Sequence, residues 1–192
     1  EELDAAKKEL EEARKALTEK AEQQKPDPTP TPTPNPNPAP DTVKTVPKKG
    51  TVFTDGKGIS YKVTKSDAKK GTVAVTGTRK KRNKITIPAT VTKDGYTFKV
   101  TEIAAKAFKA NKKIRSIVIP STVRKIGKQA FLNCKNLKKI TLKTSYLSKK
   151  AIGAKAFKGI HKKATIKVPK KQKKAYQKLL KSKGVGKKVK IK

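Results

Sequence analysis

The strongest constraint in this chain is a stretch that nearly repeats itself. Phe108 and Phe131 are 23 residues apart, and Phe131 and Phe157 are 26 residues apart. The same 23-residue interval separates four further pairs: Ile103/Ile126, Ala107/Ala130, Ile114/Leu137 and Ile117/Ile140. A three-residue insertion between Leu142 and Ile152 accounts for the longer second interval. Apolar residues that recur in phase with a period in the twenties predict a solenoid whose turns each bury one face against the next.

One unit of this repeat can be interpreted residue by residue. Ile117 and Ile119 alternate with less apolar neighbours, which indicates a short strand with one buried face. Pro120 lacks an N–H and should end that strand, and Gly127 should permit a tight bend. Phe131, between its two equivalents, should fill one core column. We expect four rungs of a short parallel sheet: 85–87, 117–119, 140–142 and 166–168.

These residues carry a family resemblance. The pattern I-x-I-P-x-x-V-x-x-I-G-x-x-A-F-x-x-C-x-x-L over residues 117–137 resembles the BspA-like branch of bacterial leucine-rich repeats. The resemblance is strong over 103–168. It departs from the pattern at Ala104 in place of glycine, at Lys143 in place of proline, and at Lys163 in an apolar column. It implies a bacterial surface protein with a role in adhesion to host or matrix proteins, and it brings no catalytic residue.

The first 47 residues lie outside the resemblance. Residues 1–24 are rich in Glu, Lys and Ala, with Leu3, Leu10 and Leu17 spaced by seven, and predict the end of a charged helical or coiled-coil stalk. A solitary frayed helix is the alternative. Residues 25–47 hold nine of the twelve prolines and predict an extended polyproline linker. The chain does not begin with Met, so we expect Glu1 to be a processed end or a cut from a longer protein.

The two flanks of the repeats differ in kind. Residues 48–102 predict a β-rich N-terminal cap, with a hairpin around the Asp55–Gly58 turn, a strand over 72–76, and a second Asp-Gly turn at Asp94. Residues 169–192 predict a C-terminal cap. It contains a helix over 170–183 with Ala175, Leu179 and Leu180 inward, then a stop at Gly184 and a closing strand at 189–191. The expected fold is therefore an α+β repeat protein: a short leucine-rich-repeat solenoid with parallel strand rungs over 103–168, capped at both ends.

Charge is distributed unevenly. Residues 25–192 carry 46 basic and six acidic groups, a net charge of +40, and after Glu102 there are 30 Lys and Arg but no Asp or Glu. Such a surface attracts polyanions in a salt-dependent way. Only five of the 51 basic residues are Arg, which argues against sequence-specific nucleic-acid recognition. No apolar run approaches the ~20 residues that a membrane span requires.

Few residues suggest chemistry. The single histidine, His161, falls in an expected turn column and has no acidic neighbours. The single cysteine, Cys134, falls in an apolar column, which favours a buried inert thiol. We predict no enzyme activity, cofactor or metal site, because no carboxylate follows Glu102. The cluster Arg79–Arg82 is interpreted as a solvated loop.

The sequence thus favours a non-enzymatic adhesion module on the outside of a bacterial cell, binding a protein of a host, matrix or neighbouring cell. The alternative is retention on anionic wall polymer through the lysine-rich surface. A protein ligand should contact the outward residues that alternate with the buried ones on the rungs. These residues are Lys84, Thr86, Ser116, Val118, Lys139, Thr141, Thr165 and Lys167.

Overall fold

A computed structural model describes residues 45–80 and 82–192. Residues 1–44 and residue 81 are not among them. The predicted stalk (1–24) and most of the predicted linker (25–47) therefore lie outside the described residues.

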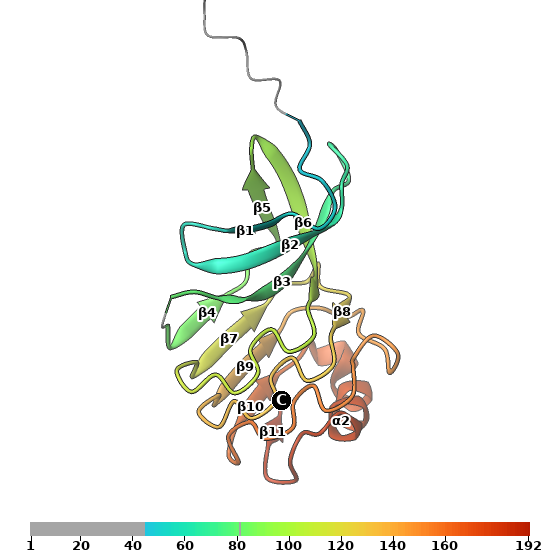
Figure 1. Cartoon of the computed structure of the whole chain (residues 1–192). Coiled ribbons are helices and arrows are strands. Elements are labelled where there is room, and N and C mark those ends of the chain that lie inside the picture. Colours follow the sequence, from blue (N-terminus) through green and yellow to red (C-terminus); the bar gives the residue numbers. More distant parts are fainter. Residues whose placement is uncertain (1–44, 81) are drawn as a thin grey trace, which may run out of the picture. The chain divides into compact units, whose positions relative to one another are not determined.

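Two β-sheets organise the described residues (Figure 1). The first has the order β1-β2-β3-β6-β5, with β8 also paired to β6. The bounds of its strands are β1 Val52–Thr54, β2 Ile59–Lys65, β3 Thr72–Thr78, β5 Thr90–Lys93, β6 Tyr96–Ile103 and β8 Lys125–Ile126. Antiparallel pairing joins β1 to β2, β2 to β3 and β5 to β6, whereas β6 is parallel to β3 and β8. The predicted hairpin around Asp55–Gly58 is thus present, and the predicted Asp-Gly turn at Asp94 joins the antiparallel strands β5 and β6.

Side-chain hydrogen bonds fix the first hairpin of this sheet. Asp55 Oδ1 accepts a hydrogen bond from the Ile59 backbone N–H at 2.8 Å, and Asp55 Oδ2 accepts one from the buried Tyr61 hydroxyl at 2.9 Å. An aspartate at the start of a turn commonly satisfies backbone donors in this way. Burial and the nearby carboxylate together raise the pKa of Tyr61 far above its ordinary value. The tyrosine therefore stays a neutral donor in this turn.

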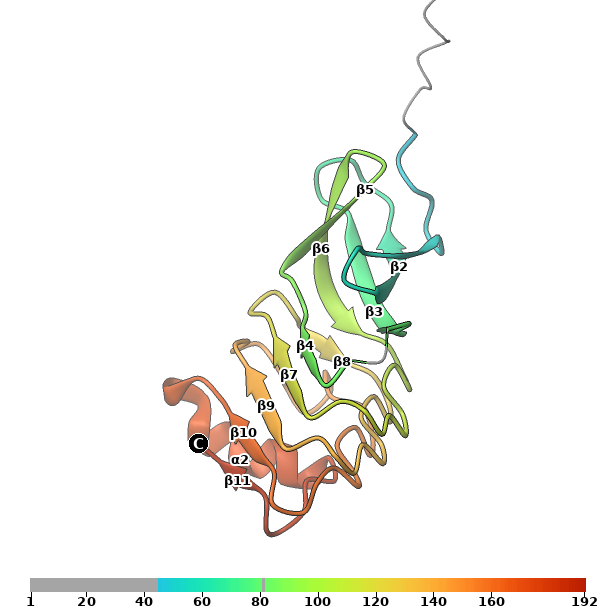
Figure 2. The ribbon, with the colours of Figure 1, turned by 90° about the vertical axis from the view of Figure 1, so that its left-hand side faces the viewer.

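The second sheet has the order β11-β10-β9-β7-β4, and all four of its pairings are parallel. The bounds of its strands are β4 Lys84–Thr86, β7 Ser116–Ile119, β9 Lys139–Leu142, β10 Thr165–Lys167 and β11 Lys190–Ile191. Figure 2 shows these strands one after another along the domain. Strands are present at all four predicted rungs, and the isoleucines Ile85, Ile117, Ile140 and Ile166 occupy equivalent positions.

The predicted aromatic column is present. Phe108, Phe131 and Phe157 are buried, and adjacent rings are stacked with centroids 5.4 Å apart at interplanar angles of 6° and 13°. A second column links Ile103, Ile126 and Ile152 by parallel bridges. Residues at equivalent positions of successive repeats therefore pack on one another.

Gly127 and Gly153 have a role other than the predicted bend. Neither has a positive φ angle, so their backbone conformation is open to any residue. Instead, a Cβ atom on Gly127 would lie 2.4 Å from the Ala105 nitrogen, and one on Gly153 would lie 2.3 Å from the Lys128 nitrogen. Glycine is needed at these positions because the backbones of adjacent repeats approach too closely for a side chain.

The C-terminal helix differs in one detail from the prediction. A 3-10 turn over Lys170–Gln172 precedes the α-helix α2 (Lys173–Ser182), and Gly184 follows it with a φ of +96°. Tyr176 and Leu180, four residues apart and hence on one face, are buried, whereas Ala175 is exposed. The expected inward position of Ala175 was wrong because the larger Tyr176 occupies the core-facing position.

Candidate functional site

The eight residues predicted to bind a protein form two rows on the second sheet. Strand register places Lys84, Ser116, Lys139 and Thr165 in the first row, and Thr86, Val118, Thr141 and Lys167 in the second. The side chains of Lys84, Thr86, Lys139 and Lys167 are exposed, and the other four are half-buried. The sheet therefore brings the predicted residues together, and we name this surface the strand face.

The first row continues onto β11, where Lys190 pairs with Thr165. Lys190 was not among the residues predicted from the sequence, although the predicted closing strand gave the signal needed to include it. With Lys190, the row alternates ammonium and hydroxyl groups from strand to strand: Lys84, Ser116, Lys139, Thr165 and Lys190. Because neighbouring strands lie about 4.8 Å apart, successive lysines in this row are rooted about 10 Å apart.

The positive charge of the strand face is not neutralised within the described residues. The three ion pairs found there are Lys65–Asp67 at 2.9 Å, Lys93–Asp94 at 2.7 Å and Lys125–Glu102 at 3.0 Å. None of them involves a strand-face lysine. These ammonium groups are therefore available to carboxylates or phosphates of a partner.

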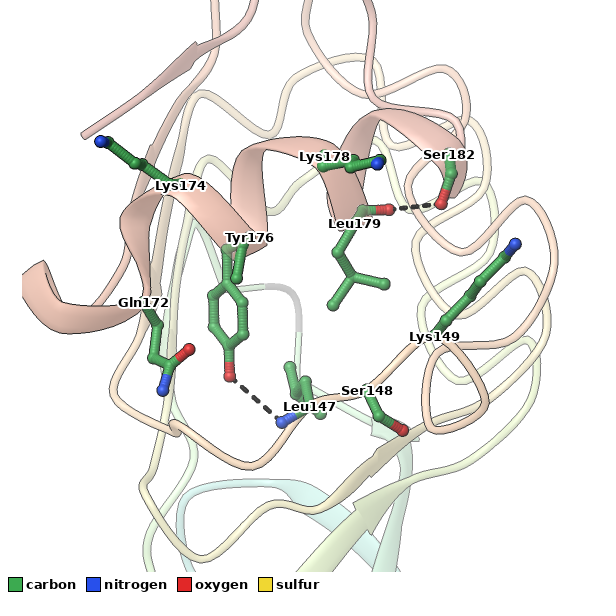
Figure 3. A pocket seen from close by; sticks show the side chains of 10 residues that line it. Leu147, Ser148, Lys149, Gln172, Lys174, Tyr176, Lys178, Leu179 and Ser182 are labelled. Atoms are coloured by element: carbon green, nitrogen blue, oxygen red, sulfur yellow. Dashed lines mark hydrogen bonds between the residues drawn. The ribbon is translucent and has the colours of Figure 1, made fainter.

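A second surface feature lies between α2 and the loop that follows β9. It is an open hollow of about 610 Å³, and we name it the helix groove. Figure 3 shows Tyr176 and Leu179 pointing from α2 toward Leu147 and Ser148 of the loop. Leu147 is only 5% exposed, Tyr176 is 2% exposed, and Leu179 is half-buried, so the floor is apolar and recessed. Lys149, Lys174 and Lys178 also line the groove and are exposed.

Hydrogen bonds hold the groove open in a fixed form. The buried Tyr176 hydroxyl donates to the Thr144 carbonyl at 2.9 Å and accepts from the Leu147 N–H at 3.1 Å. The hydroxyl of Thr144 in turn donates to the Val123 carbonyl at 2.6 Å. Burial raises the pKa of Tyr176, which keeps the hydroxyl protonated. The loop and the helix are therefore joined through one phenol, which the sequence analysis had not identified.

The candidate chemical residues are structural. Cys134 is buried, and its thiol donates to the Phe108 carbonyl at 2.8 Å. Burial raises the pKa of Cys134 to about 11, so it is a poor nucleophile at neutral pH. His161 is half-buried, and its Nδ1 accepts a hydrogen bond from the Lys163 N–H at 3.2 Å. Residues 45–80 and 82–192 contain no cluster of three metal-ligating side chains and no helix long and apolar enough to cross a membrane.

Comparison with known proteins agrees with the geometry of the repeats. Residues 101–191 match six copies of the family described as BspA type leucine rich repeat region. The match therefore extends through α2 to β11. A comparison with curated proteins found no match.

Two solved structures illustrate the similarity. A leucine-rich cell surface protein from Faecalibacterium prausnitzii A2-165 is 28% identical, with a TM-score of 0.50 over 64% of this chain and 38% of that protein. A leucine-rich repeat protein from Bacteroides ovatus is 31% identical, with a TM-score of 0.46 over 60% of this chain and 36% of that protein. The chain thus spans less than two fifths of either relative. Proteins with such repeats are generally binding modules rather than enzymes. Residues 101–191 of this chain therefore match the BspA-type leucine-rich repeat family.

Proposed function

We propose that this chain is an adhesion module of a bacterial surface protein and that it binds a protein ligand on the strand face. In this proposal the stacked repeats form a short solenoid, with the β1–β6 region as its N-terminal cap and α2 with β11 as its C-terminal cap. Residues 25–47 would serve as a spacer and residues 1–24 as the end of a stalk. The module would act outside the cell.

The observation that carries this proposal is the register of the strand face. Parallel strands carry one row of hydroxyl and ammonium groups over five strands and a second row, which includes Val118, over four. Both rows lie beside isoleucines that are at most 2% exposed from Ile85 to Ile166. A rigid backbone under a row of polar side chains reduces the conformational entropy that is lost when a partner binds. Repeat proteins commonly bind partners on such an extended surface. The lysines favour a partner with acidic groups at its contact surface.

A second candidate function is retention on an anionic wall polymer, and the charge distribution supports it. The sequence after Glu102 contains 30 basic residues and no carboxylate side chain. Many of these basic residues lie on turns rather than on the strand face. A flexible polyanion would be attracted to this distributed charge without requiring the register of the rows.

The experiment that tests the proposal compares two double charge reversals in the full chain. Lys139→Glu/Lys167→Glu changes the strand face, whereas Lys109→Glu/Lys128→Glu makes the same charge change at exposed turn positions. Binding to immobilised matrix proteins and to teichoic acid is measured at about 0.15 M salt, at which the Debye length is about 8 Å, and again at high salt. Protein binding on the strand face predicts a selective loss for the first variant. Equal losses for both variants, abolished by salt, would refute it and support polymer retention.

A further inference from the structure

The helix groove lies beside an interruption of the repeat. The three-residue insertion that lengthens one interval from 23 to 26 residues lies between Leu142 and Ile152. The loop in this interval contributes Leu147, Ser148 and Lys149 to the groove (Figure 3). None of the residues that line the groove belongs to the two rows of the strand face. The groove is therefore a separate feature of this chain.

The floor of the groove offers apolar contact, and most polar groups beside it are engaged, although the Gln172 amide at its edge makes no hydrogen bond within the described residues. The Tyr176 hydroxyl is engaged by Thr144 and Leu147, and the Ser182 hydroxyl donates to the Leu179 carbonyl at 2.7 Å. An incoming polar group would find few free partners on this floor. The side chains of Leu147, Tyr176 and Leu179 can instead surround an apolar group, which loses contact with water when it enters.

The rim of the groove has the opposite character. Lys149 comes from the loop, whereas Lys174 and Lys178 lie one helical turn apart on α2. In Figure 3 Lys149 extends toward the Ser182 end of the groove, and Lys174 lies at the other end. None of the three lysines forms an ion pair with a carboxylate among residues 45–80 and 82–192. A ligand that fits must therefore combine apolar bulk with negative charge on both sides of it.

We propose that the helix groove is a second binding site, which takes a short acidic peptide segment of a partner protein with a leucine-like side chain as its anchor. The shape favours a peptide over a membrane surface. The apolar floor is recessed behind exposed lysines, so a flat bilayer cannot reach it, whereas one side chain can. The hollow is also open, so a long acyl chain would keep much of its surface in water. Because Tyr176 holds the two walls together, the site is formed before the ligand arrives.

The test uses a fluorescein-labelled peptide, Glu-Glu-Leu-Glu-Glu-Leu-Glu-Glu, and the full chain at about 0.15 M salt, at which distant charges are screened. A second peptide with serine in place of both leucines keeps the same charge. Fluorescence anisotropy gives both affinities. We expect the serine peptide to bind at least about tenfold more weakly, because it lacks the apolar side chain that would lose contact with water in the groove. Equal affinities for the two peptides would overturn the proposal, because attraction would then be purely electrostatic.

Variants of the protein locate the site. Lys149→Glu/Lys178→Glu should weaken binding of the leucine peptide about tenfold more than the equal charge change Lys109→Glu/Lys128→Glu. Amide chemical-shift changes on peptide addition should map to residues 147–149 and 172–182. Similar losses for both variants, or shift changes spread over the turns, would overturn the proposal. Tighter binding to phosphatidylglycerol vesicles than to the peptide, lost selectively in Lys149→Glu/Lys178→Glu, would also overturn it in favour of a membrane site.

Discussion

The close contact between repeats at Gly153 gives a quantitative test of the fold. A Cβ atom on Gly153 would lie 2.3 Å from the Lys128 nitrogen and 2.6 Å from its Cα, all on backbone that cannot rotate away. Ordinary carbon contacts are about 3.5–4.0 Å, so Gly153→Ala must separate the two turns by about 1 Å or more. That movement strains the 2.8 Å hydrogen bond from the Gly153 N–H to the Ile126 carbonyl.

The expected cost adds two effects. Overpacking of a well-packed interior costs about 1–3 kcal/mol, and a weakened backbone hydrogen bond costs about 1 kcal/mol more. We therefore expect Gly153→Ala to lower the free energy of unfolding by about 2–4 kcal/mol. Gly153 has no positive φ angle, so backbone strain does not contribute.

Two other glycines separate the possible causes. Gly50 has a φ of +96° but open space around its Cα, so Gly50→Ala reports backbone strain alone and should cost about 1–2 kcal/mol. Gly56 has neither a positive φ nor a neighbour within 4 Å, so Gly56→Ala should be neutral or stabilise by about 0.4–1 kcal/mol. Urea unfolding followed by circular dichroism measures all three variants. The explanation by close approach is refuted if Gly153→Ala costs no more than Gly56→Ala.

Three further predictions concern buried side chains. Phe131→Ala should cost about 3–5 kcal/mol in the same unfolding assay, and a loss under about 1 kcal/mol would contradict the aromatic column. Tyr176→Phe leaves the Thr144 carbonyl and the Leu147 N–H without this partner and should lower the free energy of unfolding by about 1–3 kcal/mol. No loss of stability is expected if a water molecule replaces the hydroxyl. The Cys134 thiol should resist a thiol reagent in the native protein at pH 7 and react after unfolding. The folded-state pKa of Cys134 is raised to about 11. The stability that its protonated thiol contributes to the folded state is therefore fully present below pH 9 and is lost as the pH rises through 11. Unfolding at pH 9–11 should therefore show a decline of about 2–3 kcal/mol that Cys134→Ala reduces.

The buried columns of the fold were predictable because the same residue type recurs at the same position of successive repeats. Phe108, Phe131 and Phe157 repeat one environment, so their shared phase identifies a common buried position without knowledge of the backbone. The strand face was predictable for the same reason, because an outward residue alternates with each buried isoleucine. Lys190 was missed because β11 is two residues long and follows a loop that breaks the period.

The helix groove could not be predicted in this way. Its central contact joins Tyr176 to Thr144, 32 residues apart in the sequence, and occurs only once in the chain. A contact that occurs only once leaves no periodic pattern in the sequence from which it could be predicted. Ala175 shows the same limit, since helical spacing alone allowed it to be inward and only the larger Tyr176 decided which face packs on the core.

The strand face and the helix groove follow from this difference between repeated and unique structure. Repeated columns produce a regular surface, and on the strand face its specificity depends on which residue each strand presents, such as Val118 among hydroxyl and ammonium groups. Departures from the repeat produce concave sites, because a longer loop cannot lie flat on the next turn and leaves space beside it. The insertion before Ile152 and α2 together form such a space, and a buried phenol keeps it open. If the longer loop has no part in a second site, shortening it by three residues should leave binding of the acidic leucine peptide unchanged. If it forms the second site, that deletion should abolish peptide binding while the stacked phenylalanines and the strand face remain intact.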